Sequence, residues 1–398
     1  MAGISNARVI GYAALSVPLS MLMMQLIVYL PPFYASVTGL DIATVGFIFL
    51  LARSWDAVID PAIGYLSDRS DTRWGRRKPW VFVGVPLLLL GVHFFLQPSG
   101  EVTTTYLLVT ALCFYIALTM VQIPYLSMAA EMSRDYHLRT RIVSFREAGT
   151  MIGNLVATAV PLIVLAGTQP SLADILDVFA MMLYVLMPLA AIAVLTAAPV
   201  TSNRSSTSIR AALSVVPRNG PLRRLLVGVF LFWLGGSIFN ALVLFVVEQG
   251  LGLASGDFLW LVFFQYIFGL VGMPFWLWVA RRWSRHIALA IGGMAFLGAL
   301  PVLFLLEGAG LTPTICAFAA LGLVSSVIWV MPPALVADTI EYGRWRGLGD
   351  DAALYMALYH FVHKMAIAFG VGIALPLAGL VGFAPGIENT RELKTPGY

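Results

Sequence analysis

The sequence predicts an all-α membrane protein, and three observations support this fold class: its composition, its long apolar runs and the placement of its basic residues. Of the 398 residues, 60% are hydrophobic and 11% are charged, whereas soluble domains contain roughly 25% charged residues. The mean hydropathy is +0.88. A soluble fold of this length could not bury so much apolar sequence, so we expect lipid to cover it.

Eleven runs of the chain are long and apolar enough to cross a bilayer, which takes about 20 residues of helix. We expect these helices at residues 9–33, 41–67, 80–97, 103–131, 141–167, 174–198, 222–248, 256–280, 286–306, 311–340 and 352–383.

Basic residues gather in alternate loops between these runs. The loops after the second, fourth, sixth, eighth and tenth runs all contain arginine, and the loops between them contain neither lysine nor arginine. This asymmetry is the positive-inside pattern. It predicts a multi-pass protein of a bacterial inner membrane with a cytoplasmic N-terminus, and it argues against a nucleic-acid partner, which would need these charges on one soluble face.

The longest polar stretch, at residues 199–221, predicts a cytoplasmic linker between an N-terminal six-helix bundle (1–198) and a C-terminal bundle (222–398). A glycine followed by basic residues ends the second run of each half, at Gly64 and at Gly272. Such internal repetition is typical of secondary transporters built from two similar halves.

The loop after the second run predicts a gating latch. We expect Gly64 to let two helix backbones approach closely, and we expect Asp68 to pair with loop arginines such as Arg76 and Arg77. In the second half, Asp338 and Glu341 end the tenth run, and we expect them to pair with Arg344, Arg346 or the arginines at 281–285 as a gate or a cap. The alternative for the first loop is a topology anchor that only keeps positive charge on one side.

Three ionisable residues lie inside the second run. Arg53, Asp56 and Asp60 share one helical face, and intramembrane charges are functional candidates because their insertion is costly. We expect both carboxylates to face a hydrated cavity. They can supply oxygens to Na⁺, or one can hold a proton because its neighbour disfavours a second negative charge. The alternative is an internal ion pair that only joins helices.

Other polar residues lie within the apolar runs. Arg146 begins the inner part of the fifth run, and Lys364 lies deep in the eleventh, where Asp56 or Asp60 is its expected partner. Ser20, Gln122 and Tyr125 can line a solute site or hydrogen-bond between helices, and the sequence leaves both open. His360 and His363 lack further metal ligands, so we expect them to be packed or to line a cavity, and we expect no metal or cofactor.

The residues RSWDAVIDPAIG at 53–64, RWGRRKPW at 73–80 and ADTIEYGRW at 337–345 resemble those of the glycoside–pentoside–hexuronide:cation symporters, a branch of the major facilitator superfamily that includes the melibiose carriers. The resemblance extends over nearly the whole chain. It implies the major facilitator fold, with two pseudo-symmetric bundles and alternating access.

The resemblance also implies site roles. Asp56 and Asp60 match the family's cation-site acids, Arg146 matches an arginine near the sugar, and Lys364 matches a lysine beside the cation site. The implied partners are a small-molecule solute, a monovalent cation (Na⁺, H⁺ or Li⁺) and the bilayer, and we expect a monomer.

This chain departs from the family at three places. Gln122 replaces an aspartate, Ser20 replaces an acid in the first helix, and only eleven of twelve expected spans are found. The first two changes remove acceptors that suit a hydroxyl-rich sugar.

We therefore expect cation-coupled symport of a small solute such as a sugar or glycoside, with H⁺ favoured over Na⁺ because Gln122 removes a charged oxygen donor. One alternative is a carrier of an amphipathic or anionic solute, such as a lysolipid or organic acid, because Arg146 and Lys364 face few acids. Another is a transport-inactive sensor. The chain has no His-Glu-x-x-His or Gly-x-Ser-x-Gly motif, so we do not expect an enzyme.

Overall fold

The computed structural model describes residues 5–70, 72–132, 136–198, 216–347, 352–380 and Phe383, and within these ranges it leaves out the side chains at 37, 130, 136, 137, 139, 140 and 352–354. Most of the linker expected at 199–221 and the chain beyond Phe383 lie outside the described residues.

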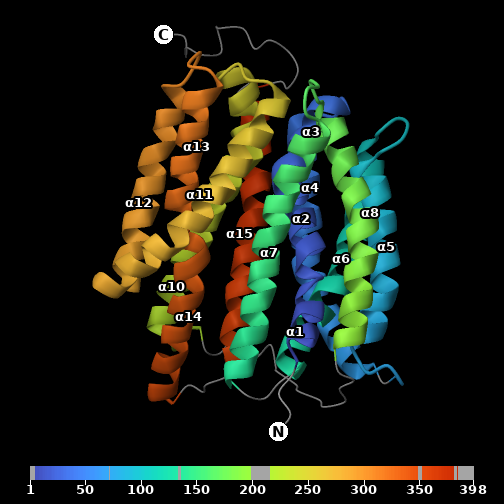
Figure 1. The fold of residues 1–398 in the computed structure, drawn as a ribbon, viewed down its shortest axis with the longest axis vertical. Coiled ribbons are helices and arrows are strands. Elements are labelled where there is room, and N and C mark those ends of the chain that lie inside the picture. Colours follow the sequence, from blue (N-terminus) through green and yellow to red (C-terminus); the bar gives the residue numbers. More distant parts are fainter. Residues whose placement is uncertain are drawn as a thin grey trace. The chain divides into compact units, whose positions relative to one another are not determined.

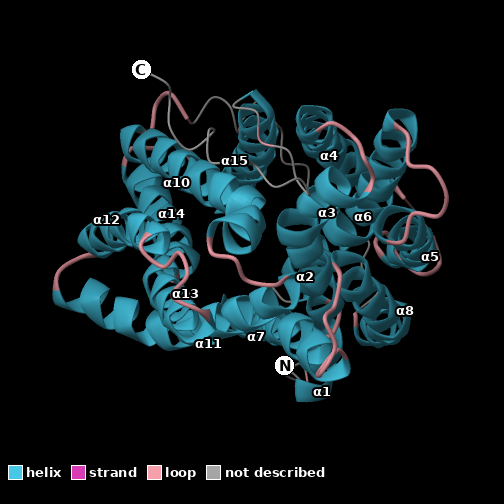
Figure 2. Ribbon diagram, turned by 90° about the horizontal axis from the view of Figure 1, so that it is seen from above, coloured by secondary structure: helices cyan, strands magenta, loops and turns pink. Residues whose placement is uncertain are grey.

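Within the described residues the chain is helical and contains no strand, as the end-on view shows (Figure 2). The helices are α1 (Asn6–Ala13), α2 (Ser16–Met24), η1 (Gln25–Tyr29), α3 (Leu30–Val37), α4 (Ile42–Arg69), α5 (Lys78–Leu96), α6 (Thr104–Met132), α7 (Tyr136–Val164), α8 (Leu172–Ala197), α10 (Gly220–Phe245), η2 (Val246–Gly250), α11 (Ser255–Arg282), α12 (Arg285–Phe304), α13 (Leu311–Ser325), α14 (Val327–Trp345) and α15 (Ala352–Leu380).

These helices form 11 segments that are long and apolar enough to cross a membrane. The predicted eleven spans are therefore confirmed. The first span joins α1, α2, η1 and α3, and the tenth joins α13 and α14.

By mutual packing the chain forms two compact units, one of residues 1–205 and 372–398 and the other of residues 206–371. In the first unit α4 packs on α6, α2 on α7, and α5 on both α6 and α8 (Figure 1). In the second unit α11 packs on α13, and α12 packs on α13 and α14. Gly46 of α4 leaves room for the last turns of α15, since a Cβ atom there would lie 2.6 Å from Pro376 Cδ.

The first span is interrupted because it contains prolines. Pro31 has no N–H group to donate to the carbonyl one turn earlier, and the turn before it widens to a π-helix in which the Leu30 N–H bonds to Gln25 O. A second π-turn ends α10, where the Leu251 N–H bonds to Val246 O at 2.9 Å. Single π-turns frequently mark functional sites, and here they occur in the first span of each half.

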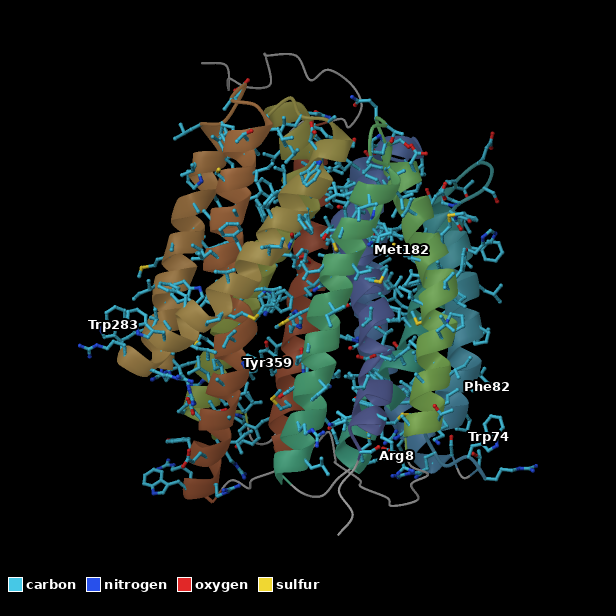
Figure 3. The ribbon with its side chains drawn as sticks, viewed as in Figure 1. Arg8, Trp74, Phe82, Met182, Trp283 and Tyr359 are labelled. Atoms are coloured by element: carbon cyan, nitrogen blue, oxygen red, sulfur yellow. The ribbon has the colours of Figure 1, made fainter. Side chains whose placement is uncertain are left out.

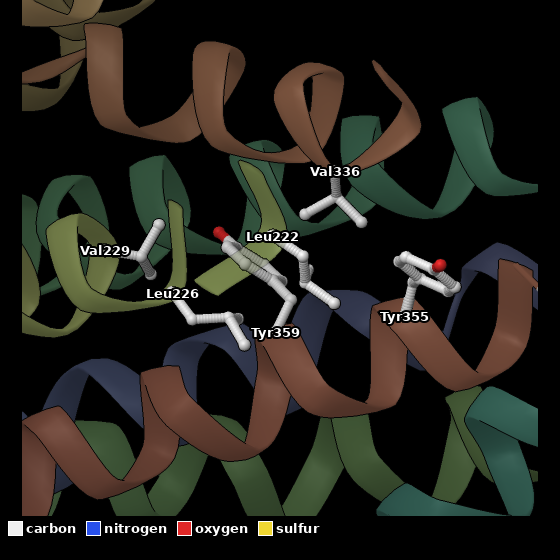
Figure 4. Close-up of a cluster of buried hydrophobic side chains, with 6 residues drawn as sticks. All are labelled: Leu222, Leu226, Val229, Val336, Tyr355 and Tyr359. Atoms are coloured by element: carbon white, nitrogen blue, oxygen red, sulfur yellow. The ribbon is translucent and has the colours of Figure 1, made fainter. Parts of the chain in front are cut away.

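A cluster of buried side chains holds the second unit together where α10, α14 and α15 meet (Figure 4). Leu222, Leu226 and Val229 project from α10, Val336 from α14, and Tyr355 and Tyr359 from α15. Asn219 caps α10 and its amide donates to Thr339 O at 3.0 Å. The cluster therefore fixes the start of α10 against α14 and α15.

Candidate functional site

A hydroxyl lies against both intramembrane carboxylates of α4. Thr119 Oγ1 on α6 is 2.9 Å from Asp56 Oδ1 and 3.2 Å from Asp60 Oδ1. Thr119 is fully buried, Asp56 is 2% exposed, and Asp60 is half-buried. At 1.5 Å per residue, Asp56 and Thr119 both lie roughly 20 Å along helices about 40 Å long. The acid pair is therefore at mid-span.

This arrangement can hold one proton. A hydroxyl has a single hydrogen to donate, so both contacts are hydrogen bonds at once when one carboxyl is protonated and donates to Thr119 Oγ1 while Thr119 donates to the other carboxylate. Carboxylate and hydroxyl oxygens also suit a hard cation. Asp56 itself is buried against the Thr119 hydroxyl of α6.

Arg53 lies one turn before Asp56 and is also buried, with 5% of its surface exposed. Its guanidinium carbon is 5.4 Å from the centre of the Tyr115 ring on α6, and Tyr115 interacts electrostatically with both Arg53 and Asp56. Arg53 Nη2 has no hydrogen-bond partner in the described part of the chain. The guanidinium therefore keeps one donor for a further group.

Gln122 follows Tyr115 and Thr119 on the same face of α6, at positions i+7 and i+3. Its Oε1 atom is buried and has no hydrogen-bond partner among the described residues. Gln122 thus lies one helical turn after Thr119, whose hydroxyl contacts the acid pair, and its Oε1 atom offers a neutral hydrogen-bond acceptor.

Arg146 and Tyr125 belong to a second polar cluster in the first unit. Arg146 Nη2 lies 2.5 Å from Glu147 Oε1, and the guanidinium interacts electrostatically with Tyr12 and Tyr125. The Tyr12 and Tyr125 rings stack with centroids 4.8 Å apart, and the Tyr12 hydroxyl donates to Tyr125 O at 3.2 Å. The structure therefore brings together two predicted solute residues and adds Tyr12 from α1.

Ser20 lies at a contact between two helices. Its hydroxyl donates to Val17 O at 2.9 Å within α2, and it faces Gly153 of α7, where a Cβ atom would lie 2.1 Å from Ser20 Oγ. One turn away, a Cβ at Gly149 would lie 2.2 Å from Ser16 Oγ. Ser20 therefore packs two helices together, because the glycines allow close backbone approach.

The predicted latch residues of the first unit form one ion-pair cluster. Arg77 donates to Asp68 Oδ1, to Ser67 Oγ at 2.6 Å and to Glu131 Oε1 at 3.0 Å. Arg76 donates to the same Glu131 oxygen at 3.0 Å. We call Asp68, Arg76, Arg77 and Glu131 the charged latch. It joins the ends of α4 and α6 to the start of α5.

The close helix approach expected at Gly64 is not found. A Cβ atom there would meet only Ile123 Cγ2 of α6, at 3.7 Å, which is ordinary van der Waals contact. A glycine is therefore not required at this position by the packing seen here.

In the second unit Arg285, at the start of α12, pairs with Asp338 near the end of α14. This matches the link between Arg77 and Glu131 in the first unit, since in both cases the third span begins with the arginine and the fourth ends with the acid. The pair is exposed, with 47% and 42% of the two side chains accessible. Glu341 is also exposed.

Lys364 and His363 lie on α15 in the second unit, and both are half-buried. The His363 ring contacts Trp233, with centroids 4.1 Å apart, and stacks near Tyr359 at 6.3 Å. His363 is therefore packed among aromatic rings, as expected from the sequence.

Sequence reasoning missed Thr119, Glu131 and Tyr12. Thr119 could have been found as a polar residue one turn before Gln122. Glu131 could have been found as the acid that ends the fourth run beside a basic loop. Tyr12 gave no signal, because an aromatic residue early in an apolar run is ordinary.

The model of the family described as "MFS/sugar transport protein" matches residues 11–395. The chain therefore belongs to this family, and the resemblance to the glycoside–pentoside–hexuronide:cation symporters is confirmed. The family consists of transporters rather than enzymes. With the 11 apolar spans found in the described part of the chain, it is a multi-pass inner-membrane protein.

Three relatives illustrate the range of the family. The chain is 25% identical to the isoprimeverose transporter of Lactiplantibacillus pentosus, over 90% of this chain and 76% of the relative. It is 26% identical to the glucuronide carrier protein homolog of Escherichia coli K12, over 92% of this chain and 81% of the relative. It is 21% identical to the sodium-dependent lysophosphatidylcholine symporter 1-B of Danio rerio, over 92% of this chain and 75% of the relative.

Among solved structures, a bacterial homologue of the human lysosomal transporter Spinster matches with a TM-score of 0.66 and 12% identity, over 95% of this chain and 83% of that one. At this identity the likeness concerns the fold alone. The predicted major facilitator fold is confirmed.

Proposed function

We propose that the chain is a symporter that couples the movement of a small sugar or glycoside to a monovalent cation by alternating access, with H⁺ favoured over Na⁺. One observation carries this proposal: the Thr119 hydroxyl lies within hydrogen-bond distance of both Asp56 and Asp60 at mid-span. A structural ion pair needs one acid, whereas a carrier needs a place where a cation can be gained and lost.

The sugar class is supported by the relatives. Two of them are named for isoprimeverose and for glucuronide, and both align with most of this chain. Arg146, Tyr125, Tyr12 and Gln122 are the proposed solute contacts, because they combine charged and neutral hydrogen-bonding groups with two stacked aromatic rings.

The donor set supports proton coupling. One shared proton satisfies Asp56, Thr119 and Asp60 together, whereas a bound Na⁺ needs several further oxygens. Gln122 offers only a neutral amide where the family has a carboxylate. Arg53 is the proposed counter-charge on α4.

We include Lys364 among the residues that couple cation and solute movement only because its position in the sequence matches the family's lysine beside the cation site. The charged latch, Asp338 and Glu341 are the proposed gating elements, since they lie where loops and helix ends meet.

The test is uptake into proteoliposomes under a pH gradient or a Na⁺ gradient imposed separately, with isoprimeverose and a glucuronide as radiolabelled probes. Wild-type protein should accumulate one sugar under the pH gradient. Asp60→Asn should abolish accumulation but leave counterflow exchange at equal concentrations measurable. Accumulation against a gradient by Asp60→Asn would show that Asp60 is not the coupling acid.

A second candidate is a carrier of an anionic or amphipathic solute. The zebrafish relative is named for lysophosphatidylcholine, and Arg146 provides a cation within the first unit. Lysophosphatidylcholine and glucuronic acid, added as competitors in the same uptake assay, separate the two candidates: inhibition by the lysolipid but by no sugar favours the second.

A further inference from the structure

Four of the basic residues near the start of α5 fall into two groups. Arg76 and Arg77 are buried and neutralised by Asp68 and Glu131. Arg8 on α1 and Lys78 at the start of α5 take part in none of the ion pairs found among the described residues. The second group therefore presents positive charge outward.

Arg8 and Lys78 come from different helices but lie close enough to repel each other electrostatically. Both α1 and α5 pack on α8, and Gly11 lies against the end of α8, where its Cβ would be 2.9 Å from Ala197 Cβ. Arg8 is exposed and Lys78 is half-buried. Two neighbouring cations that pair with no acid among the described residues suit an anion placed between them.

Exposed aromatic side chains lie at the same end of the first unit as Arg8 (Figure 3). Trp74 is 49% exposed and Phe82 is 53% exposed, and their rings meet edge to face at 5.3 Å. Farther along α5, Val83, Leu87 and Leu90 are also exposed. Aromatic residues concentrate where the headgroup region meets hydrocarbon, so a basic surface here continues into an apolar one.

We propose that this surface, formed by Arg8, Trp74, Lys78 and Phe82, binds a phospholipid with an anionic headgroup. The lipid phosphate lies between Arg8 and Lys78, and an acyl chain follows the exposed apolar side chains of α5. A soluble anion would use the two cations but would gain nothing from Phe82 and the residues beyond it. The pattern of basic loops predicts that this end faces the cytoplasmic leaflet, where basic side chains attract anionic lipids.

The test is native mass spectrometry of the purified full chain with equimolar phosphatidylglycerol and phosphatidylcholine. Wild-type protein should retain phosphatidylglycerol preferentially. Arg8→Gln with Lys78→Gln should weaken that binding roughly 30-fold, at about fivefold per basic residue. Arg8→Gln alone should weaken phosphatidylglycerol binding roughly fivefold. Because Arg8 is exposed, this single variant tests the proposal even if the double variant folds poorly.

The matched control is Arg223→Gln with Arg224→Gln, which removes the same charge from exposed positions at the start of α10. It should bind phosphatidylglycerol as the wild type does. Equal loss in this control, wild-type binding by the double variant, or equal retention of phosphatidylcholine would overturn the proposal. Displacement of the bound lipid by millimolar inorganic phosphate would overturn the choice of a lipid over a free phosphate ion.

Discussion

At the residue scale, the first unit places its mid-span polar groups on two facing helix surfaces. Arg53, Asp56 and Asp60 project from α4, and Thr119 meets the two acids from α6. Because buried polar groups are costly unless they are hydrogen-bonded, the acids and the hydroxyl depend on one another. Each change at this site should therefore affect cation binding more than solute binding.

Thr119→Val keeps the shape of the side chain and removes the hydroxyl. Hydrogen bonds to charged groups contribute about 1.5–3 kcal/mol, so the affinity for the coupling ion should fall roughly 10- to 100-fold. Thr119→Ser, which restores the hydroxyl, should retain most of the affinity. Uptake measured against the size of the pH gradient checks this, and equal uptake by the valine and serine variants would contradict it.

Gln122→Asp adds a carboxylate next to the acid pair's hydroxyl on the same face of α6. A further charged oxygen should favour Na⁺, so a Na⁺ gradient alone should then drive accumulation. The controls are Gln122→Glu, whose side chain is one methylene longer than that of aspartate, and Gln122→Asn, which has the length of aspartate but no charge. A Gln122→Asp protein that folds and exchanges solute, yet ignores Na⁺, would count against this role of Gln122.

At the scale of elements, small residues decide how closely helices pack. α2 and α7 touch through Ser16 and Ser20 on one side and Gly149 and Gly153 on the other. In the second unit, a Cβ at Gly370 of α15 would lie 2.4 Å from Ser237 Cβ of α10, and Ser237 donates to Ile367 O at 2.9 Å. The first and fifth spans of each half thus use the same kind of serine–glycine contact.

Gly153→Ala should destabilise the protein by about 1–3 kcal/mol, as overpacking in a tight contact does. The added Cβ would lie 2.3 Å from Val17 O, a backbone atom that cannot rotate away. Gly228→Ala in α10 has nothing within 4 Å and should be neutral or slightly stabilising, because alanine favours helix. Thermal unfolding in detergent measures both, and an equal melting temperature for the two variants would refute the packing argument.

At the scale of the whole molecule, the two halves share a latch design but differ in its strength. In the charged latch the arginine side chains are 6% and 7% exposed and Glu131 is 16% exposed, whereas Arg285 and Asp338 are 47% and 42% exposed. Buried charges depend on their partners far more than exposed charges do.

Glu131→Gln should therefore cost about 3–5 kcal/mol of stability, because Glu131 is the ion-pair partner of the buried Arg76 and one of the two partners of the buried Arg77. Asp338→Asn should cost no more than about 1 kcal/mol, since its pair is largely solvent-exposed. Unfolding followed in parallel for both variants measures the difference. If Asp338→Asn proves the more damaging, the first-unit latch is not the stronger one.

The sequence determined the class of the molecule. Apolar runs must be covered by lipid, basic loops alternate between the two sides of the membrane, and the spacing of Arg53, Asp56 and Asp60 places them on one helical face. These properties can be predicted because they depend only on local composition and helical period. The pairing of Asp68 with Arg77 also followed, since the two residues flank one short loop.

Only the tertiary structure decided which partners meet across helices. Thr119 binds the acid pair, Glu131 completes the charged latch, and Ser20 packs on Gly153, because each contact depends on how α6 and α7 are rotated and set against their neighbours. Helix rotation is fixed by the sum of many small packing contacts, such as those at Gly149 and Gly153, and no local pattern in the chain reports that sum.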